Sequence, residues 1–398
     1  MFKKIIFWVI ILFLITNCKN SKIEEKTLTN NNLLKSTIQE EKIQQILPKP
    51  KIKKISSFKF TRGLYLSAYT VVTKKFFTIL DSAANAGINT IVFDLKNING
   101  DIFFSIKGDE GIKNDNIKPF INISKVVNKL HRRNIRAVAR LVMFHDQYLA
   151  ENDTLLRPLM ENGNVWKENR NGKPAWLDSS QPDVQKRLLD IIEQVAQQGV
   201  DEIQMDYVRF PTQGKLANAQ FYFQKEDSYF AKVDSNYIKR CKSDIIQKFV
   251  EKAKNICEKY KVTLTGDIFA IVAWQRKVDV QNTGQDIRKI TQYLDAIHPM
   301  IYSSHFSASF GYRKNIANEP YYIVYKATKL TQKYTNKKCK VIPYIQANSW
   351  KVNYKPSYIY AQIEAVKNLN ADGYILWNAS NKYLKTLRWI KKYNQISS

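Results

Sequence analysis

Cysteine and histidine are scarce in this chain, with four of each among 398 residues. The cysteines stand far apart and form no CxxC pair: Cys18, Cys241, Cys257 and Cys339. Because short CxxC spacing is typical of zinc and redox sites, its absence argues against those classes. The histidines are also too scattered to suggest one ligand set: His131, His145, His298 and His305. We therefore expect no metal and no cofactor, and we expect the last three cysteines to be small buried residues.

Acidic residues are few, since 35 Asp and Glu face 63 Lys and Arg, which leaves a formal charge of +28. Such an excess can indicate nucleic acid, an anionic membrane or an acidic polymer as partner. The lysines are scattered, however, and no nucleic-acid-binding motif accompanies them. We expect a solvated basic surface and no nucleic-acid partner. On the basis of the charge alone, an adhesin for anionic polymers is a further hypothesis.

Long hydrophobic runs are absent as well. The longest lies at the start, where basic residues precede the apolar run 5–15, which is too short to span a bilayer comfortably. The residues that follow, ending in Asn17 and Cys18, resemble the lipobox of bacterial lipoproteins. This predicts a signal peptide over 1–17, lipidation of Cys18 and a place in the cell envelope, on the periplasmic or surface face of a membrane. An uncleaved N-terminal anchor is the alternative.

Residues 18–58 are rich in Lys, Asn, Glu, Ser and Thr and poor in aromatic residues. Such a segment buries little apolar surface, so we expect a flexible tether. The folded domain is then predicted over 59–398, a length that suits one large α/β domain.

Strand-like and helix-like patterns alternate along that domain. The predicted strands are 63–69, 90–96, 135–144, 202–210, 262–270, 296–306, 340–348 and 373–379. The predicted helices are 74–86, 121–133, 182–198, 237–260, 285–293, 321–334, 356–370 and 382–393. Strands that each precede a helix predict a single (β/α)8 TIM barrel. A doubly wound open sheet is the alternative, but it usually carries a Gly-rich first turn that is missing here.

Two connections are too long for plain βα loops: 146–182 after the third predicted strand and 212–236 after the fourth. The first contains Trp166 and Trp176, and the second is rich in aromatic residues. Because βα loops build the active sites of barrels, we expect the first to form a wall or lid of the site.

One strand presents polar side chains on a single face. Ile203 and Met205 alternate with Gln204 and Asp206, and we expect Pro211 to end the strand pairing because proline has no N–H to donate. A carboxylate inside a sheet is costly unless it is paired, hydrogen-bonded or used in chemistry. Asp206 is therefore the first candidate for a catalytic residue.

Similar alternation on the other predicted strands directs more polar side chains to the same end of the barrel. One pocket is expected to hold Asp94, Lys96, Arg140, Asp206, Asp267, Tyr302, Gln346 and Trp377. His305 lies just beyond its strand, and Arg209 follows Asp206 closely. Carboxylates on adjacent strands about 4.8 Å apart suit the retaining cleavage of a glycosidic bond, and aromatic rings suit sugar faces.

Each residue also has a structural interpretation. Asp206 and Arg209 can form an ion pair at the barrel mouth, and Asp267 can be a hydrogen-bonded cap. Asp94, Lys96 and Arg140 can form a buried charge network without contact to substrate.

Several motifs together carry a family resemblance. They are RGLYLSAY at 62–69, VFDLK at 92–96, DYVRFP at 206–211, HPMIYSSH at 298–305 and GYILWNAS at 373–380. From about residue 60 onward the chain resembles the glycoside-hydrolase-like family of bacterial (β/α)8 domains and is similar, more remotely, to the α-amylase-type barrels. The likeness implies Asp206 as nucleophile and Asp267 as acid/base, where the amylase-type clan has a longer Glu. Asn378, in the last motif, joins the predicted substrate contacts.

The sequence thus predicts a membrane-tethered glycoside hydrolase that cleaves a polysaccharide or glycan. Asp206 and Asp267 would be catalytic. Substrate contacts are expected from Asp94, Lys96, Arg140, Arg209, Tyr302, His305, Gln346, Trp377 and Asn378. A glycan-binding lipoprotein that keeps the barrel without catalysis is the alternative.

Overall fold

The computed structural model describes residues 54–107 and 116–397. The predicted signal peptide, Cys18 and nearly all of the predicted tether lie outside these residues. Within the described part of the chain, no helix combines the length and the apolar character needed to cross a membrane.

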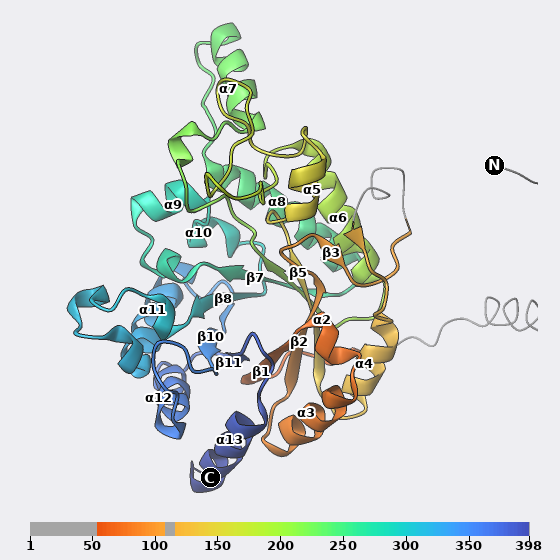
Figure 1. Ribbon diagram of the computed structural model, residues 1–398, viewed down its shortest axis with the longest axis vertical. Helices are drawn as coiled ribbons and strands as arrows, with labels where there is room; N and C mark the ends of the chain where they lie inside the picture. Colours follow the sequence, from red (N-terminus) through yellow and green to blue (C-terminus); the bar gives the residue numbers. More distant parts are fainter. Residues whose placement is uncertain (1–53, 108–115, 398) are drawn as a thin grey trace, which may run out of the picture. The chain divides into compact units, whose positions relative to one another are not determined.

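A closed barrel of parallel strands forms the centre of the domain (Figure 1). Its strands, in order around the barrel, are β1 (Thr61–Leu66), β2 (Thr90–Lys96), β5 (Arg136–Val142), β6 (Glu202–Asp206), β7 (Thr263–Ile268), β8 (Ala296–Ile301), β10 (Tyr344–Gln346) and β11 (Gly373–Trp377). The barrel closes because β1 pairs with both β2 and β11. The predicted (β/α)8 fold is confirmed.

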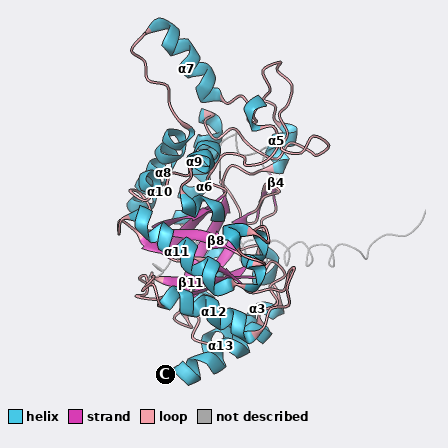
Figure 2. Cartoon of the chain, turned by 90° about the vertical axis from the view of Figure 1, so that its left-hand side faces the viewer, coloured by secondary structure: helices cyan, strands magenta, loops and turns pink. Residues whose placement is uncertain are grey.

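Helices surround the strands, as the view at right angles shows (Figure 2). The helices that follow the strands are α3 (Lys74–Asn85), α4 (Ile123–His131), α6 (Pro182–Ala196), α8 (Lys242–Lys259), α10 (Ile287–Ile290), α11 (Pro320–Thr335), α12 (Pro356–Lys367) and α13 (Leu384–Ser397). Proline occupies the first position of α6, α11 and α12, where its missing N–H costs no helical hydrogen bond. Asn122 caps α4 by accepting a hydrogen bond from the Lys125 N–H.

Alternation along the strands separates two apolar clusters. Residues that face outward, such as Ile91, Phe93 and Ile203, pack under the helices in the large core. Residues that face inward, such as Val92, Val138 and Ile375, form a smaller cluster inside the barrel. The small inner cluster leaves room for polar side chains at both ends of the barrel.

Elements outside the barrel pattern fill the long connections. Short elements are α2 (Ala68–Val71), β3 (Asp101–Ile102), β4 (Asn116–Ile117), α5 (Gln147–Asn152) and α9 (Lys277–Thr283). The short strand β9 (Lys340–Val341) pairs with β8 and precedes β10 in the barrel. The 3-10 turns are η1 (Leu216–Asn218), η2 (Ala270–Trp274), η3 (Ser303–His305), η4 (Phe310–Tyr312) and η5 (Ile316–Asn318). The second long connection contains α7 (Tyr222–Val233), a helix that projects away from the barrel in both views (Figures 1 and 2).

Strand β6 is shorter than predicted, and Pro211 does not end it. It ends at Asp206, because the next residue, Tyr207, has a positive φ of 51°. A left-handed backbone is rare for a residue with a large side chain and turns the chain out of the strand. The carboxylate therefore stands at the rim of the barrel, where the strand stops.

A bulge interrupts the alternation of β2. Asp94 pairs with Arg140, but Lys96 rather than Leu95 pairs with Leu141, so one residue is inserted between them. A bulge re-aims the side chains that follow it. This changes the direction of Lys96, as described below.

Candidate active site

The pocket lies at the C-terminal end of the barrel and has a volume of about 630 Å³. Its lining combines carboxylates, arginines and aromatic rings. Of the predicted site residues, the structure brings together Asp94, Arg140, Asp206, Arg209, Asp267, Tyr302, His305 and Trp377.

The guanidinium of Arg140 joins three carboxylates. Its Nη1 donates to Asp94 Oδ1 at 2.5 Å and its Nη2 to Asp206 Oδ2 at 2.5 Å. Its Nε lies 4.0 Å from Asp267 Oδ2. Burial lowers the pKa of Arg140, but the nearby Asp94 and Asp206 carboxylates outweigh burial and raise the pKa well above its usual value. One fixed positive charge therefore holds the carboxylates of three neighbouring strands together.

Asp206 has donors on both carboxylate oxygens. Besides the bond from Arg140, its Oδ1 accepts a hydrogen bond of 2.6 Å from the Tyr207 N–H. The positive φ of Tyr207 belongs to the same turn. A strained backbone at this position costs about 1–3 kcal/mol, and such strain is typical of functional sites. The arrangement fixes the carboxylate at the floor of the pocket.

Asp267 has a different environment, although it is the neighbour of Asp206. Met205 pairs with Gly266, so the two aspartates are the next residues on adjacent strands. Asp267 Oδ1 accepts a hydrogen bond of 2.6 Å from Gln204 Nε2, whereas its buried Oδ2 has no hydrogen-bond partner. Burial and the charge of Asp206 raise the pKa of Asp267 well above its usual value. This carboxyl group is therefore suited to keep a proton.

Asp94 completes the cluster from β2. Its Oδ2 accepts a 2.5 Å hydrogen bond from the Tyr65 hydroxyl. Burial raises the pKa of Asp94 against the opposing effects of Arg140 and Tyr65. Because its contacts are to these two side chains, we assign Asp94 to the orientation of Arg140.

Aromatic rings form one side of the pocket. Tyr302 and Trp377 stack with ring centroids 4.6 Å apart and an interplanar angle of 23°. His305 packs edge-on against Tyr302, Trp377 and the exposed ring of Trp350. Flat apolar faces of this kind can pack against the C–H faces of a sugar ring.

The first long connection supports the pocket from behind, with Trp176 4.8 Å from the guanidinium carbon of Arg209. No residue of 146–182 or 212–236 lines the pocket itself. Other walls come from residues after β2, β7 and β8, namely Asn97, Ile98, Phe269, Arg276, Phe306 and Phe310.

Three of the predicted substrate contacts, Lys96, Gln346 and Asn378, do not line this pocket, so the predicted place of Lys96 and Gln346 inside it is corrected. Lys96 is turned by the bulge of β2 and forms a buried salt bridge of 2.7 Å with Asp146. The Gln346 amide bonds to Ser304 and to the Asn348 carbonyl, which ties two loops together. Asn378 donates to the carbonyls of Ala347 and Lys382 in the turn after β11.

Two tyrosines that line the pocket are missing from the sequence prediction, whereas Gln204 is predicted on the polar face of its strand. Tyr65 and Tyr344 point inward from β1 and β10, and Gln204 connects Tyr344 to Asp267 by donating to both. The period-2 alternation of the predicted strands contains the signal for both tyrosines. Tyrosine is common in apolar cores, however, so alternation alone does not separate a pocket tyrosine from a packed one.

The cysteines also differ in part from prediction. Cys257 is buried, but Cys339 is half-buried and Cys241 is exposed just before α8. Among residues 54–107 and 116–397, no group of three or more His, Cys, Asp or Glu side chains could hold a metal ion.

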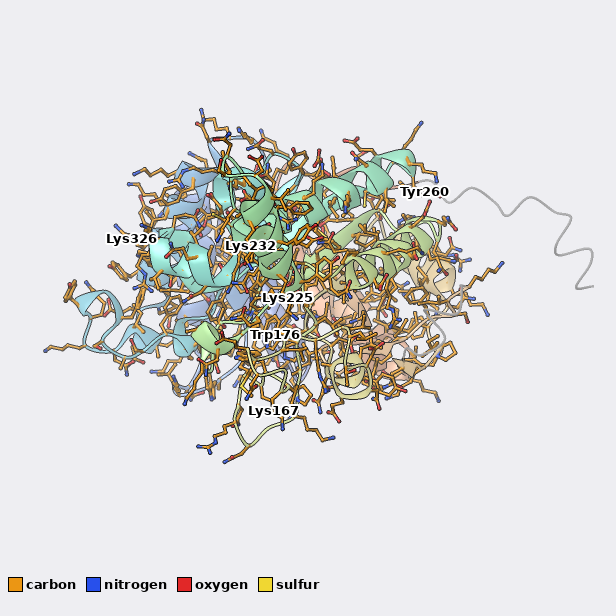
Figure 3. The ribbon with its side chains drawn as sticks, turned by 90° about the horizontal axis from the view of Figure 1, so that it is seen from above. Lys167, Trp176, Lys225, Lys232, Tyr260 and Lys326 are labelled. Carbon is orange, nitrogen blue, oxygen red and sulfur yellow. The ribbon has the colours of Figure 1, made fainter. Side chains whose placement is uncertain are left out.

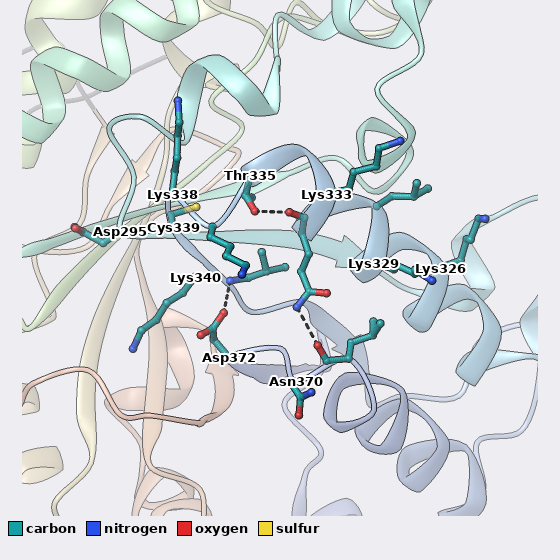
Figure 4. A pocket seen from close by; sticks show the side chains of 15 residues that line it. Asp295, Lys326, Lys329, Lys333, Thr335, Lys338, Cys339, Lys340, Asn370 and Asp372 are labelled. Carbon is teal, nitrogen blue, oxygen red and sulfur yellow. Dashed lines mark hydrogen bonds between the residues drawn. The ribbon is translucent and has the colours of Figure 1, made fainter.

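The basic surface is spread over separate elements, with Lys167 in a loop, Lys225 and Lys232 on α7 and Lys326 on α11 (Figure 3). A larger hollow of about 1070 Å³ lies at the opposite end of the barrel and is rich in lysine (Figure 4). Its two carboxylates are already engaged, Asp295 with Lys254 and Asp372 with the Val341 N–H. It therefore lacks the pair of carboxyl groups on adjacent strands that the mouth pocket has in Asp206 and Asp267.

A closed (β/α)8 barrel whose mouth holds neighbouring carboxylates and aromatic walls is a barrel of the glycoside-hydrolase type. The chain belongs to the family described as "Putative glycosyl hydrolase domain", which matches residues 63–383. The family resemblance read from the sequence is confirmed. No protein with curated annotation matches the chain.

Solved structures of similar fold include several glycoside hydrolases. The PgaB (BpsB) glycoside hydrolase domain from Bordetella bronchiseptica aligns with a TM-score of 0.59 at 12% identity, over 83% of this chain and 98% of that chain. An endo-β-1,4-mannanase from Thermotoga petrophila aligns with a TM-score of 0.52 at 11% identity, over 86% and 78%. A hypothetical protein from Ruminiclostridium thermocellum shares 27% identity over 51% of this chain and 96% of that chain, with a TM-score of 0.42.

Proposed function

We propose that the barrel hydrolyses glycosidic bonds of a polysaccharide or glycan by a retaining mechanism. The carrying observation is the contrast between two adjacent carboxylates, of which Asp206 is bound by two N–H donors and Asp267 has a buried, unpartnered oxygen. Retaining enzymes need one carboxylate that attacks and one carboxyl group that donates a proton.

In the first step Asp206 attacks the anomeric carbon while Asp267 donates its proton to the departing glycosidic oxygen. A covalent glycosyl–Asp206 ester forms and the leaving sugar departs as an alcohol. In the second step Asp267 removes a proton from water, and the resulting attack releases the sugar and restores Asp206. Both carboxylates lie within 4.0 Å of the same guanidinium and their strands are adjacent, which favours the short separation of about 5–5.5 Å over the longer inverting one.

The test is to incubate the full chain with a panel of envelope and storage glycans and to look for new reducing ends by mass spectrometry. We expect product from the wild type and a loss of roughly 10³-fold or more in Asp206→Asn. Asp279→Asn is the matched control, because Asp279 lines the same pocket but pairs with Arg276 and not with Arg140.

Full activity of Asp206→Asn would refute the assignment. Absence of product, together with equal glycan binding by the wild type and Asp206→Asn, would instead support the glycan-binding barrel. That alternative draws support from the bonds of Asp206, since Arg140 must release or share the Oδ2 atom before it can attack.

We also propose that the enzyme is held at an envelope membrane through a lipid on Cys18. The support is the sequence of residues 1–18, in which basic and apolar segments precede the cysteine. Metabolic labelling with a fatty-acid analogue tests this: label in the wild type and none in Cys18→Ser is expected. Equal label in both proteins would contradict it.

A further inference from the structure

Arg209 is a buried arginine in the pocket wall without a carboxylate partner. It is 6% exposed, and among the described residues no Asp or Glu oxygen lies within the 4.0 Å salt-bridge distance of its nitrogens. The predicted alternative, an ion pair with Asp206, does not form, because Arg140 takes that carboxylate. The other arginines of the pocket are paired, Arg140 with Asp94 and Asp206 and Arg276 with Asp279.

Three aromatic rings hold this guanidinium in place. Its central carbon lies 4.8 Å from the ring centroid of Trp176, 4.9 Å from that of Tyr207 and 5.1 Å from that of Phe269. Such contacts orient a cation but replace only part of the hydration that burial removes.

Few hydrogen bonds use the donors of Arg209. Its Nη1 donates to the Phe210 carbonyl at 3.2 Å and weakly to Thr212 Oγ1 at 3.5 Å. The nearby Glu168 accepts instead from Trp176 Nε1 at 3.0 Å and from the Gln213 N–H at 3.2 Å. The Nε and Nη2 edge of the guanidinium is thus left for a partner in the pocket.

A ligand anion would supply the missing counter-charge. Burial lowers the pKa of Arg209, and the fields of Tyr207, Asp206 and Glu168 offset this only in part. Leaving a buried charge without an ionic partner is costly, typically by several kcal/mol. A substrate that brings the partner gains the corresponding interaction on binding.

We propose that Arg209 determines specificity by binding the carboxylate of a uronic-acid unit in the glycan. The Nε and Nη2 donors are coplanar and match two carboxylate oxygens in a bidentate pair. Trp176 and Phe269 add no free donor beside the guanidinium for the further oxygen of a sulfate or phosphate, since Trp176 Nε1 already donates to Glu168 and Phe269 has no polar side-chain atom. The assignment rests on the proposed function only in that the pocket receives a glycan.

Binding of simple sugars to the full chain tests the proposal by isothermal titration. The probes are D-glucuronate with D-glucose, and D-galacturonate with D-galactose, so that each pair differs only at C6. D-glucose 6-sulfate distinguishes a carboxylate site from a general anion site. We expect at least one uronate to bind roughly tenfold tighter than its neutral counterpart.

Matched variants assign that preference to one residue. Arg209→Gln should bind uronate and neutral sugar equally, and Arg209→Lys should keep only part of the preference, because an ammonium cannot form the bidentate pair. Arg313→Gln should keep the full preference, because Arg313 lies outside the pocket and pairs with Glu319. Melting temperatures of the variants verify that they remain folded.

Three results would overturn the proposal: no binding of either uronate, a uronate preference that survives in folded Arg209→Gln, or tighter binding of the sulfate. Because these sugars contain no glycosidic bond to cleave, the outcome does not depend on catalysis. Failure to hydrolyse any glycan would thus refute the proposed function, but it would not change the uronate preference measured by titration.

Discussion

The two ends of the barrel contain the same kinds of charged side chain, but the carboxyl groups at the two ends differ in their hydrogen bonds and ion pairs. At the N-terminal end Arg136 on β5 donates to Glu202 on β6 at 3.2 Å, and four residues further along these strands Arg140 donates to Asp206 at 2.5 Å. The first pair is buried and the second is partly buried. The pKa values of the carboxyl groups differ between the two ends. The pKa of Glu202 is lowered, whereas the pKa of Asp267, which lies beside Asp206 at the mouth, is raised.

The difference follows from what each carboxylate contacts. Burial alone would raise the pKa of Glu202, but His298 at 3.8 Å, Arg136 and the Thr265 hydroxyl at 2.9 Å favour its charged form. The chain also covers this end, since Arg136 donates to the Ile55 carbonyl and the Ile55 N–H donates to Asp201 at 2.7 Å.

At the mouth, none of the described residues before Tyr65 lines the pocket, and Asp267 Oδ2 lacks a hydrogen-bond partner. A carboxylate whose charged form is stabilised by several neighbours adds to the stability of the fold, whereas a carboxyl group with an oxygen that lacks a hydrogen bond retains the capacity to react. We therefore expect the N-terminal cluster to contribute mainly to stability, and under the proposed function the mouth cluster takes part in the chemistry at the expense of some stability.

The largest effect is expected from removing the ionisable group at the mouth. Asp267→Asn should lower the turnover rate by roughly 10²–10⁴-fold, because it removes the proton donor. Its free energy of unfolding at neutral pH should stay equal or rise, since the variant no longer buries an ionisable group beside Asp206. Reducing-end assays and denaturant titrations measure the two effects, and a large loss of stability would contradict the comparison.

The opposite pattern is expected at the other end. Glu202→Gln should destabilise the fold by about 3–5 kcal/mol, because it leaves Arg136 without its carboxylate. Activity per folded molecule should stay close to that of the wild type, because Glu202 does not line the mouth pocket. Urea unfolding of the purified variant tests the first statement, and a variant that is stable but inactive would place Glu202 in the catalytic machinery.

These two carboxyl groups should also give opposite dependences on pH. The folded-state pKa of Glu202 is lowered, so its stabilising effect is present above the unfolded-state pKa and is lost as the pH falls through the folded-state pKa. The folded-state pKa of Asp267 is raised, so its cost to stability grows as the pH rises from the unfolded-state pKa to the folded-state pKa.

Unfolding midpoints across pH measure this contrast. The stability lost in Glu202→Gln should be greatest at neutral pH and should shrink in acid. The stability gained in Asp267→Asn should likewise be greatest at neutral pH. A pH-independent difference for either variant would show that its charge state does not contribute.

A smaller effect is expected at the aromatic wall. Trp377→Ala should raise KM several-fold, in keeping with about 0.5–1.5 kcal/mol for an aromatic contact, and should leave kcat nearly unchanged. Tyr229→Ala on α7 is the control, since this exposed ring lies outside the pocket. Unchanged KM in Trp377→Ala would remove the ring from the sugar-binding surface.

Much of this comparison could be predicted from sequence, because alternation decides which face of a strand a side chain occupies. The bounds of β2 match the predicted 90–96, and the inward directions of Asp94, Asp206 and Asp267 follow from period 2. Lys96 shows where the prediction of side-chain direction from alternation fails. One inserted residue in β2 reverses the alternation, and a bulge of this kind has no signature in a run such as TIVFDLK.

Other features depend on contacts between distant parts of the chain. Nothing in DYVRFP indicates that Tyr207 takes a left-handed backbone and ends β6 four residues early. The sequence also does not indicate that Arg209 lacks a carboxylate partner. This follows from the folded structure, in which Asp206 pairs with Arg140 and three aromatic rings pack around the guanidinium of Arg209.

The opposite pKa shifts of Asp267 at the mouth and Glu202 at the N-terminal end can be measured without knowing the substrate. Carbon NMR of the side-chain carboxyl groups, assigned with Asp267→Asn and Glu202→Gln, follows each group as the pH is changed. We expect Asp267 to titrate well above the usual value of about 3.9 and Glu202 to titrate below its usual value of about 4.3. An Asp267 that titrates at or below its usual value would leave the mouth without a proton donor and would contradict the proposed mechanism.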